Sequence, residues 1–81
     1  MEHAYDVDVD FMDMRDDGRL WVRGADFRAG LEPAVGWYVV VGCDDADAAV
    51  AQIRAIDTDG NIELEVLRGS VESHRRLLAP A

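Results

Sequence analysis

Apolar and polar residues alternate strictly near the start of the chain. In the segment YDVDVDF, aromatic residues and valines alternate with Asp6, Asp8 and Asp10, a period of two that is typical of a half-buried strand. The phase slips just after Phe11, where a β-bulge would absorb the extra residue. We therefore predict a curved strand over residues 4–14, with the three aspartates on a solvated face or a charged sheet edge.

A tight turn is predicted in the segment RDDGRLWVR. A three-residue loop with Gly18 in the left-handed region would bring Met14 opposite Leu20. It would also bring Met12 opposite Val22, and all four side chains would then face the core. A two-residue loop would instead turn Leu20 and Val22 outward, so the longer loop gives the more coherent core.

The segment at residues 44–57 fits two structures. Its alanines and its aspartates, one of which can serve as an N-cap, favour a helix at about 45–56. Read as a strand over 49–56, it points Ile53 inward and its polar neighbours outward. The alternation in NIELEV, at residues 61–67, and the turn residues DTDG before it indicate a hairpin, so we favour the strand.

The remaining segments are punctuated by glycine and proline. Residues 24–35 contain three such breakers and are predicted to form a loop with one short helical turn. The run WYVVV has no polar residue, which suits a strand over 36–42 that is covered on both faces. At the end of the chain, Ser70 is placed to cap a short helix at about 70–78.

Together these elements predict one small, mainly β domain over residues 1–81. The expected fold is a five-stranded curled sheet or partly open barrel with a short C-terminal helix, and the alternative is an α+β fold with a helix at about 45–56. The strands are expected at residues 4–14, 19–23, 36–42, 49–56 and 61–67. Their spacing resembles that of SH3-like small barrels, although no family motif accompanies it.

The charge of the chain limits its partners. Seventeen acidic residues face eight basic ones, all arginine, which gives a formal net charge of −9. Such a surface repels phosphates and anionic lipids, so we expect neither direct nucleic-acid binding nor membrane binding. It favours basic partners or cations. Cys43 is the single cysteine, and with no signal peptide or spanning segment evident it indicates a reducing, cytoplasmic environment.

The stretch AIDTDGNIELEV partly matches the pattern of an EF-hand calcium loop. With Gly60 at the sixth position, Asp57 and Asp59 fall at the third and fifth. The first position is Ala55, however, and the closing glutamate is replaced by Val66. Both end ligands of an EF-hand loop are missing, so we expect a hairpin turn here and no metal or other cofactor.

Few residues in the chain could support catalysis. A nucleophile needs a neighbouring base, and the best pair, Ser70 with His74, is better explained by a capping role for the serine. Cys43 is followed by two aspartates, which disfavour a thiolate. We therefore expect a non-catalytic protein.

The remaining signal is a set of arginines around a tryptophan. In the expected hairpin, Arg19, Trp21 and Arg23 share the outward face, and Arg28 follows in the next loop. Tryptophan and arginine are the residue types that most often carry binding energy at interfaces. Trp37, in the apolar strand, is expected in the core.

These residues predict a protein-interaction module, either an accessory subunit or a self-associating domain. One alternative is an acidic inhibitor that mimics nucleic acid and binds a basic protein. A small ligand- or cation-binding domain is another.

Overall fold

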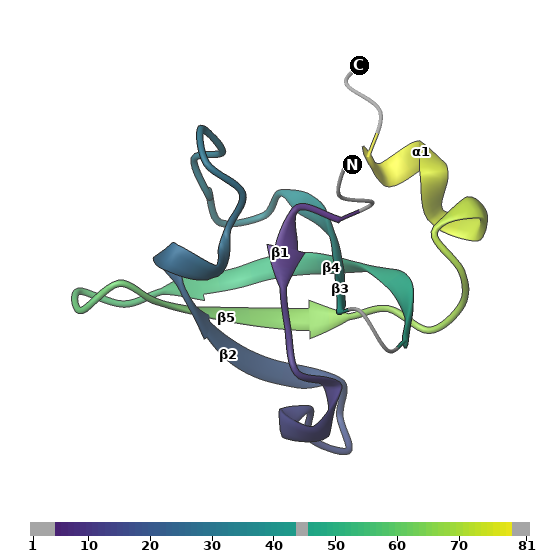
Figure 1. Ribbon diagram of the computed structural model, residues 1–81, viewed down its shortest axis with the longest axis horizontal. Coiled ribbons are helices and arrows are strands. Elements are labelled where there is room, and N and C mark those ends of the chain that lie inside the picture. The colour runs from purple at the N-terminus through teal and green to yellow at the C-terminus, as the bar shows by residue number, and fades with distance from the viewer. Residues whose placement is uncertain (1–4, 44–45, 79–81) are drawn as a thin grey trace.

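The computed structural model describes residues 5–43 and 46–78. In this part of the chain, five strands form one curled, half-barrel sheet in the order β1-β3-β4-β5-β2 (Figure 1). The strands are β1 (Val7–Asp8), β2 (Arg19–Arg23), β3 (Tyr38–Cys43), β4 (Ala46–Ile56) and β5 (Asn61–Val66). The predicted mainly β fold is confirmed. The alternative helix at about 45–56 is wrong, because that segment is β4.

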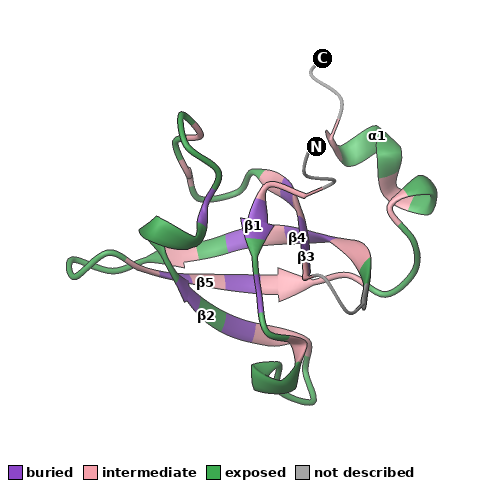
Figure 2. Cartoon of the chain, in the orientation of Figure 1, coloured by how far each residue is buried: buried purple, intermediate pink, exposed green. Residues whose placement is uncertain are grey.

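Period-two alternation builds the core. Strands β3, β4 and β5 form an antiparallel meander, and β2 pairs with the far side of β5. Leu64 of β5 lies opposite both Leu20 of β2 and Ile53 of β4. The buried cluster comprises Val7, Val9, Leu20, Val22, Phe27, Val39, Val41, Ala51, Ile53, Ile62 and Leu64. Figure 2 shows buried positions alternating with more exposed ones along β2 and β5.

The predicted three-residue loop is present between Arg15 and Arg19. The Gly18 amide donates to the Arg15 carbonyl at 2.9 Å, and the Arg15 amide donates to the Arg19 carbonyl at 2.8 Å. Gly18 has a φ of +84°, in the left-handed region that glycine adopts without a Cβ penalty.

The resemblance to a calcium loop has the same explanation. The Gly60 amide donates to the Asp57 carbonyl at 3.2 Å, and the Asp57 amide donates to the Asn61 carbonyl at 2.9 Å. Gly60 has a φ of +86°. This is again a three-residue loop closed by a left-handed glycine, and it joins β4 to β5 (Figure 1).

The first strand differs from the prediction. It is not a strand over residues 4–14 but the two-residue β1, which pairs in parallel with β3. The Asp10 carboxylate accepts a hydrogen bond from the Met12 amide at 2.9 Å and caps the short 3-10 helix η1 (Phe11–Asp13), which ends the extended backbone. The expected pairing with β2 is therefore wrong, and the Met12 side chain is 90% exposed.

The segment between β2 and β3 contains the predicted helical turn, η2 (Gly24–Asp26). It ends in a bulge, where the Gly36 amide donates to the Ile53 carbonyl and the Ile53 amide donates to the Trp37 carbonyl, at 2.7 and 2.8 Å. Gly36 and Trp37 thus oppose the single residue Ile53, directly before β3. The Trp37 side chain is 56% exposed, so its expected place in the core is wrong. Trp37 lies in the bulge, at the end of the sheet where β3 begins. β1 pairs with β3 only further along, at Val41 and Gly42, so it does not cover Trp37.

The chain ends in two short helical turns, η3 (Glu72–His74) and α1 (Arg75–Leu78). The Ser70 hydroxyl accepts a hydrogen bond from the Ser73 amide at 3.1 Å, as expected of a capping serine, although the N-cap position of η3 itself is Val71. Helix α1 contacts β3. Among the described residues, no helix has both the length and the apolar character to cross a membrane.

Candidate functional site

Arg19, Trp21 and Arg23 lie on the outward face of β2. They alternate with Leu20 and Val22, whose side chains are buried in the core. The alternation leaves the Trp21 side chain 48% exposed in the middle of a paired strand. A tryptophan exposed to this extent on a rigid strand presents apolar surface that needs no rearrangement to make contact.

Charged residues of β2 and β5 neighbour this tryptophan in the register of the two strands. Glu63 of β5 lies opposite Trp21, and its carboxylate is 3.5 Å from an Arg19 guanidinium nitrogen. One strand further on, Arg54 lies 3.7 Å from Glu65. Arg23 makes no ion pair with any residue in the described ranges. We call the surface formed by Arg19, Trp21, Arg23, Glu63 and Glu65 the Trp21 face.

The backbone edge beside the Trp21 face is largely occupied. β2 is the last strand of the sheet, so its odd-numbered amides point away from β5. The amides of Arg19 and Arg23 donate to the carboxylates of Asp17 and Asp26, each at 3.0 Å. An added strand would have to displace both carboxylates. A partner is therefore expected to contact the side chains of the face and not to extend the sheet.

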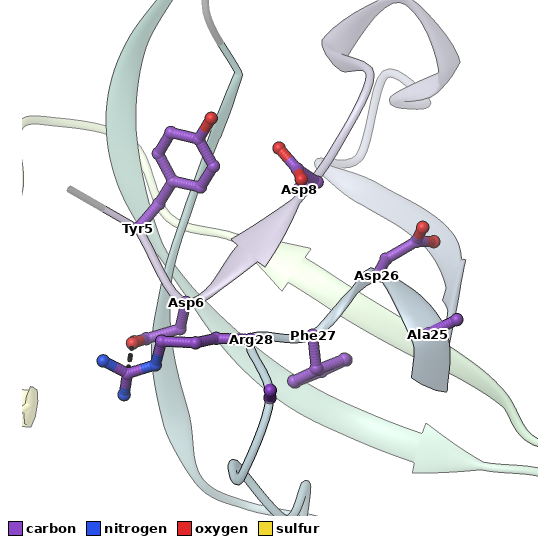
Figure 3. A pocket seen from close by; sticks show the side chains of 8 residues that line it. Tyr5, Asp6, Asp8, Ala25, Asp26, Phe27 and Arg28 are labelled. Carbon is purple, nitrogen blue, oxygen red and sulfur yellow. Dashed lines mark ion pairs between the residues drawn. The ribbon is translucent and has the colours of Figure 1, made fainter. Parts of the chain in front are cut away.

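Arg28 does not belong to the Trp21 face. Its guanidinium lies 3.2 Å from the Asp6 carboxylate, and its amide donates to the Asp6 carbonyl at 2.7 Å. Both residues line a cavity of about 330 Å³ (Figure 3), and the lining includes none of the other three predicted residues.

The expected solvated row of aspartates is therefore divided. Asp8 and Asp10 are exposed, but Asp6 is half-buried and also accepts a hydrogen bond from the Val40 amide at 3.0 Å. Sequence alternation places Asp6 on the polar face with the other two. It does not reveal that both Val40 of β3 and Arg28 contact the Asp6 carboxylate, because each contact joins residues far apart in the chain.

Other reactive groups are used structurally. His74 is hydrogen-bonded to the Arg68 carbonyl, and the Ser70 hydroxyl accepts a hydrogen bond from the Ser73 amide. The Asn61 side chain donates to the Asp57 carboxylate at 3.0 Å, and this bond, with further backbone donors, lowers the pKa of Asp57. The described ranges contain no group of three or more metal-ligating side chains arranged around a common point.

The Trp21 face thus offers a rigid aromatic group between charged residues, which is suited to contact with another macromolecule. No protein-family model, curated protein or solved structure matches this chain.

Proposed function

We propose that this protein is a non-catalytic interaction module that binds a partner protein through the Trp21 face. The observation that carries the proposal is the half-exposed tryptophan at the centre of β2, held between two arginines. We also propose that the protein acts in the cytoplasm, since its single cysteine, Cys43, suits a reducing compartment.

The size of the exposed surface supports this role. A tryptophan carries roughly 200–250 Å² of surface, and about half of the Trp21 side chain is exposed. Burying that half in an interface would contribute about 2–3 kcal/mol at ~25 cal/mol per Å². This is the magnitude at which a single side chain dominates an interface.

A pair of tryptophan variants tests the proposal. Tagged wild-type protein, Trp21→Ala and Trp37→Ala would be used for affinity capture from a lysate of the source cells, followed by mass spectrometry. Both tryptophans are about half exposed, but Trp21 lies in the edge strand β2 and Trp37 directly precedes β3, and β4 and β5 separate these two strands in the sheet. We expect one partner to be retained by the wild type and by Trp37→Ala, and lost from Trp21→Ala. Equal recovery with both variants would rule out the Trp21 face as the contact.

The same variants test self-association. Sedimentation of the purified protein measures whether copies of the chain are the partner. A concentration-dependent dimer that is weakened by Trp21→Ala would make the module self-associating. A monomer at all concentrations would leave a different protein as the expected partner.

A second candidate function is an acidic inhibitor that mimics nucleic acid. It is favoured by a run of exposed carboxylates from the end of β1 to the start of β2, at Asp8, Asp10, Asp13, Asp16 and Asp17. Such binding would weaken steeply as salt screens the charges. A captured partner that stays bound equally well at low and high salt would contradict this candidate and favour the apolar contact of Trp21.

A further inference from the structure

The cavity beside Arg28 is a formed depression with fixed walls (Figure 3). One wall is β1, and the other is the segment that follows β2. A bridge between Val7 and Phe27 and the bond from the Arg28 amide to the Asp6 carbonyl, at 2.7 Å, hold the two walls together. A volume of about 330 Å³ is at the lower end of the range for ligand pockets. It has room for the end of one long side chain.

The charges in this cavity do not balance. The Arg28 guanidinium is paired with Asp6 at 3.2 Å. The Asp26 carboxylate accepts a hydrogen bond from the uncharged Arg23 amide. Asp8 is exposed, and its carboxylate forms no ion pair with any other described residue. Within the described ranges, two of the three carboxylates therefore pair with no arginine, and Figure 3 shows the Arg28 guanidinium turned toward Asp6.

The rest of the lining is apolar or aromatic. Tyr5 contributes an aromatic ring, and Ala25 and Ala29 contribute small side chains that keep the depression open. Phe27 also borders the cavity, but its ring is buried in the core. A planar guanidinium stacks on aromatic rings and donates several hydrogen bonds to carboxylates at once. A compact, strongly hydrated ammonium group makes less use of such walls.

We propose that this cavity binds the guanidinium group of an arginine side chain presented by a partner protein. The proposal rests on the cavity, the Tyr5 ring that lines it and two carboxylates that form no ion pair with a described residue, and it is independent of the Trp21 face. The net charge of −9 acts in the same direction, since it attracts basic segments and repels acidic ones.

Three short peptides test the chemistry. The ¹⁵N-labelled protein would be titrated with acetyl-glycyl-arginyl-glycine amide and followed by NMR. The citrulline peptide, which has nearly the same shape and no charge, and the lysine peptide are the controls. We expect the arginine peptide to shift the amide signals of Asp8, Asp26 and Phe27 most strongly, the lysine peptide to bind more weakly, and the citrulline peptide not to bind.

Matched variants separate the cavity from the overall charge. Asp8→Asn with Asp26→Asn removes the two carboxylates and keeps an acceptor for the Arg23 amide. Asp13→Asn with Asp59→Asn makes the same change in net charge at exposed sites outside the cavity. We expect the first pair to weaken peptide binding about tenfold or more, from the loss of charge-assisted hydrogen bonds. The second pair should leave binding nearly unchanged.

Ala29→Leu adds an independent test, because it fills the cavity without altering any charge and should also abolish binding. Shifts spread evenly over the acidic surface, or equal losses in the two double variants, would overturn the proposal. So would equal binding of the lysine peptide, or no binding of the arginine peptide. Trp21→Ala should not affect the titration, so a failure of the Trp21 face would be seen separately.

Discussion

At the scale of single residues, two glycines share a backbone conformation but differ in their surroundings. Gly18 and Gly60 both have φ near +85°, at +84° and +86°. A Cβ on Gly18 would lie 3.0 Å from the Val66 carbonyl oxygen, whereas a Cβ on Gly60 would meet nothing within 4 Å. The first glycine is therefore required by both conformation and space, and the second by conformation alone.

We expect alanine substitutions at these two glycines to lower the free energy of unfolding by different amounts. Gly60→Ala should cost about 1–2 kcal/mol, the penalty for a left-handed alanine. Gly18→Ala should cost more, because the Val66 backbone must also move. Gly24→Ala, at a site with open space and no positive φ, is the control and should change stability by less than about 0.5 kcal/mol. Urea unfolding measures the stability of all three variants. Equal losses for Gly18→Ala and Gly60→Ala would show that the Val66 backbone moves away from the new Cβ at no cost in free energy.

The turn at Gly60 also holds a titrating group. The Asp57 carboxylate accepts hydrogen bonds from the Asn61 side chain at 3.0 Å and from the amides of Asn61 and Asp59 at 2.8 and 2.9 Å. These donors favour the charged carboxylate, the Asn61 side chain most, and lower the pKa of Asp57. The stabilisation that results is present above the ordinary carboxyl range and is lost as the pH falls through the lowered folded pKa.

Asn61→Ala should therefore raise the pKa of Asp57 toward its ordinary value of about 3.9. ¹³C NMR of the side-chain carboxyl measures this directly. Asn61→Ala should also be less stable than the wild type at neutral pH, and the difference should shrink once both proteins are protonated at Asp57. An unchanged Asp57 pKa in the variant would contradict the assigned role of the Asn61 side chain.

At the scale of elements, β1 depends on Asp6 more than on its own length. A strand of two residues alone would be only weakly attached to β3, but Asp6 adds two hydrogen bonds to Val40. The Asp6 amide donates to the Val40 carbonyl at 2.7 Å, and the Val40 amide donates to the Asp6 carboxylate at 3.0 Å. It also pairs with Arg28. The side chain thus fastens β1 to β3 and to the segment after β2.

Asp6→Ala should destabilise the protein by about 1–3 kcal/mol, since it leaves the half-buried Val40 amide without its side-chain acceptor. Asp8→Ala removes the same charge two residues further along the chain, but the Asp8 side chain makes no such contact, so the variant should change stability by less than about 0.5 kcal/mol. Thermal or urea unfolding compares the two. If both variants lost the same amount, the role of the Asp6 carboxylate in holding β1 would be wrong.

The elements that the sequence predicts best are those whose partners lie next in the chain. The strand at β2, the hairpin of β4 with β5 and both glycine turns follow from alternation and turn residues. β1 was harder to predict because alternation identifies a half-buried strand without identifying its partner. Its parallel partner β3 begins about thirty residues later, and a capping Asp10 ends it early. SH3-like character stays a prediction.

The candidate sites also differ in whether a local pattern or a distant contact determines them. The outward position of Trp21 follows from alternation with Leu20 and Val22, which a single strand determines. Arg28 and Trp37 lie in or next to a loop, where no period fixes the direction of a side chain. The cavity at Arg28 depends on a bridge between Val7 and Phe27, a contact that no local pattern announces.

At the scale of the whole molecule, repulsion among like charges opposes folding. The net charge is −9, and the folded chain measures 32 × 30 × 27 Å. At about 0.01 M salt the screening length is roughly 30 Å, so charges on opposite sides of the molecule interact. In the described residues each ion pair includes an arginine whose side chain is at least a third exposed, and such pairs contribute about 0–1 kcal/mol.

Stability should therefore rise when sodium chloride is increased from about 0.01 M to about 0.15 M, where the screening length falls to roughly 8 Å. Repulsion acts over longer distances than the local pairs and is screened more. The urea midpoint measures this, and Asp13→Asn with Asp59→Asn, which lowers the repulsion at two exposed sites, should show a smaller rise. A midpoint that falls with salt would mean that the ion pairs outweigh the repulsion. At low salt the urea midpoint of the double variant should already lie above that of the wild type. Removing two charges and screening them with salt both reduce the same repulsion between carboxylates.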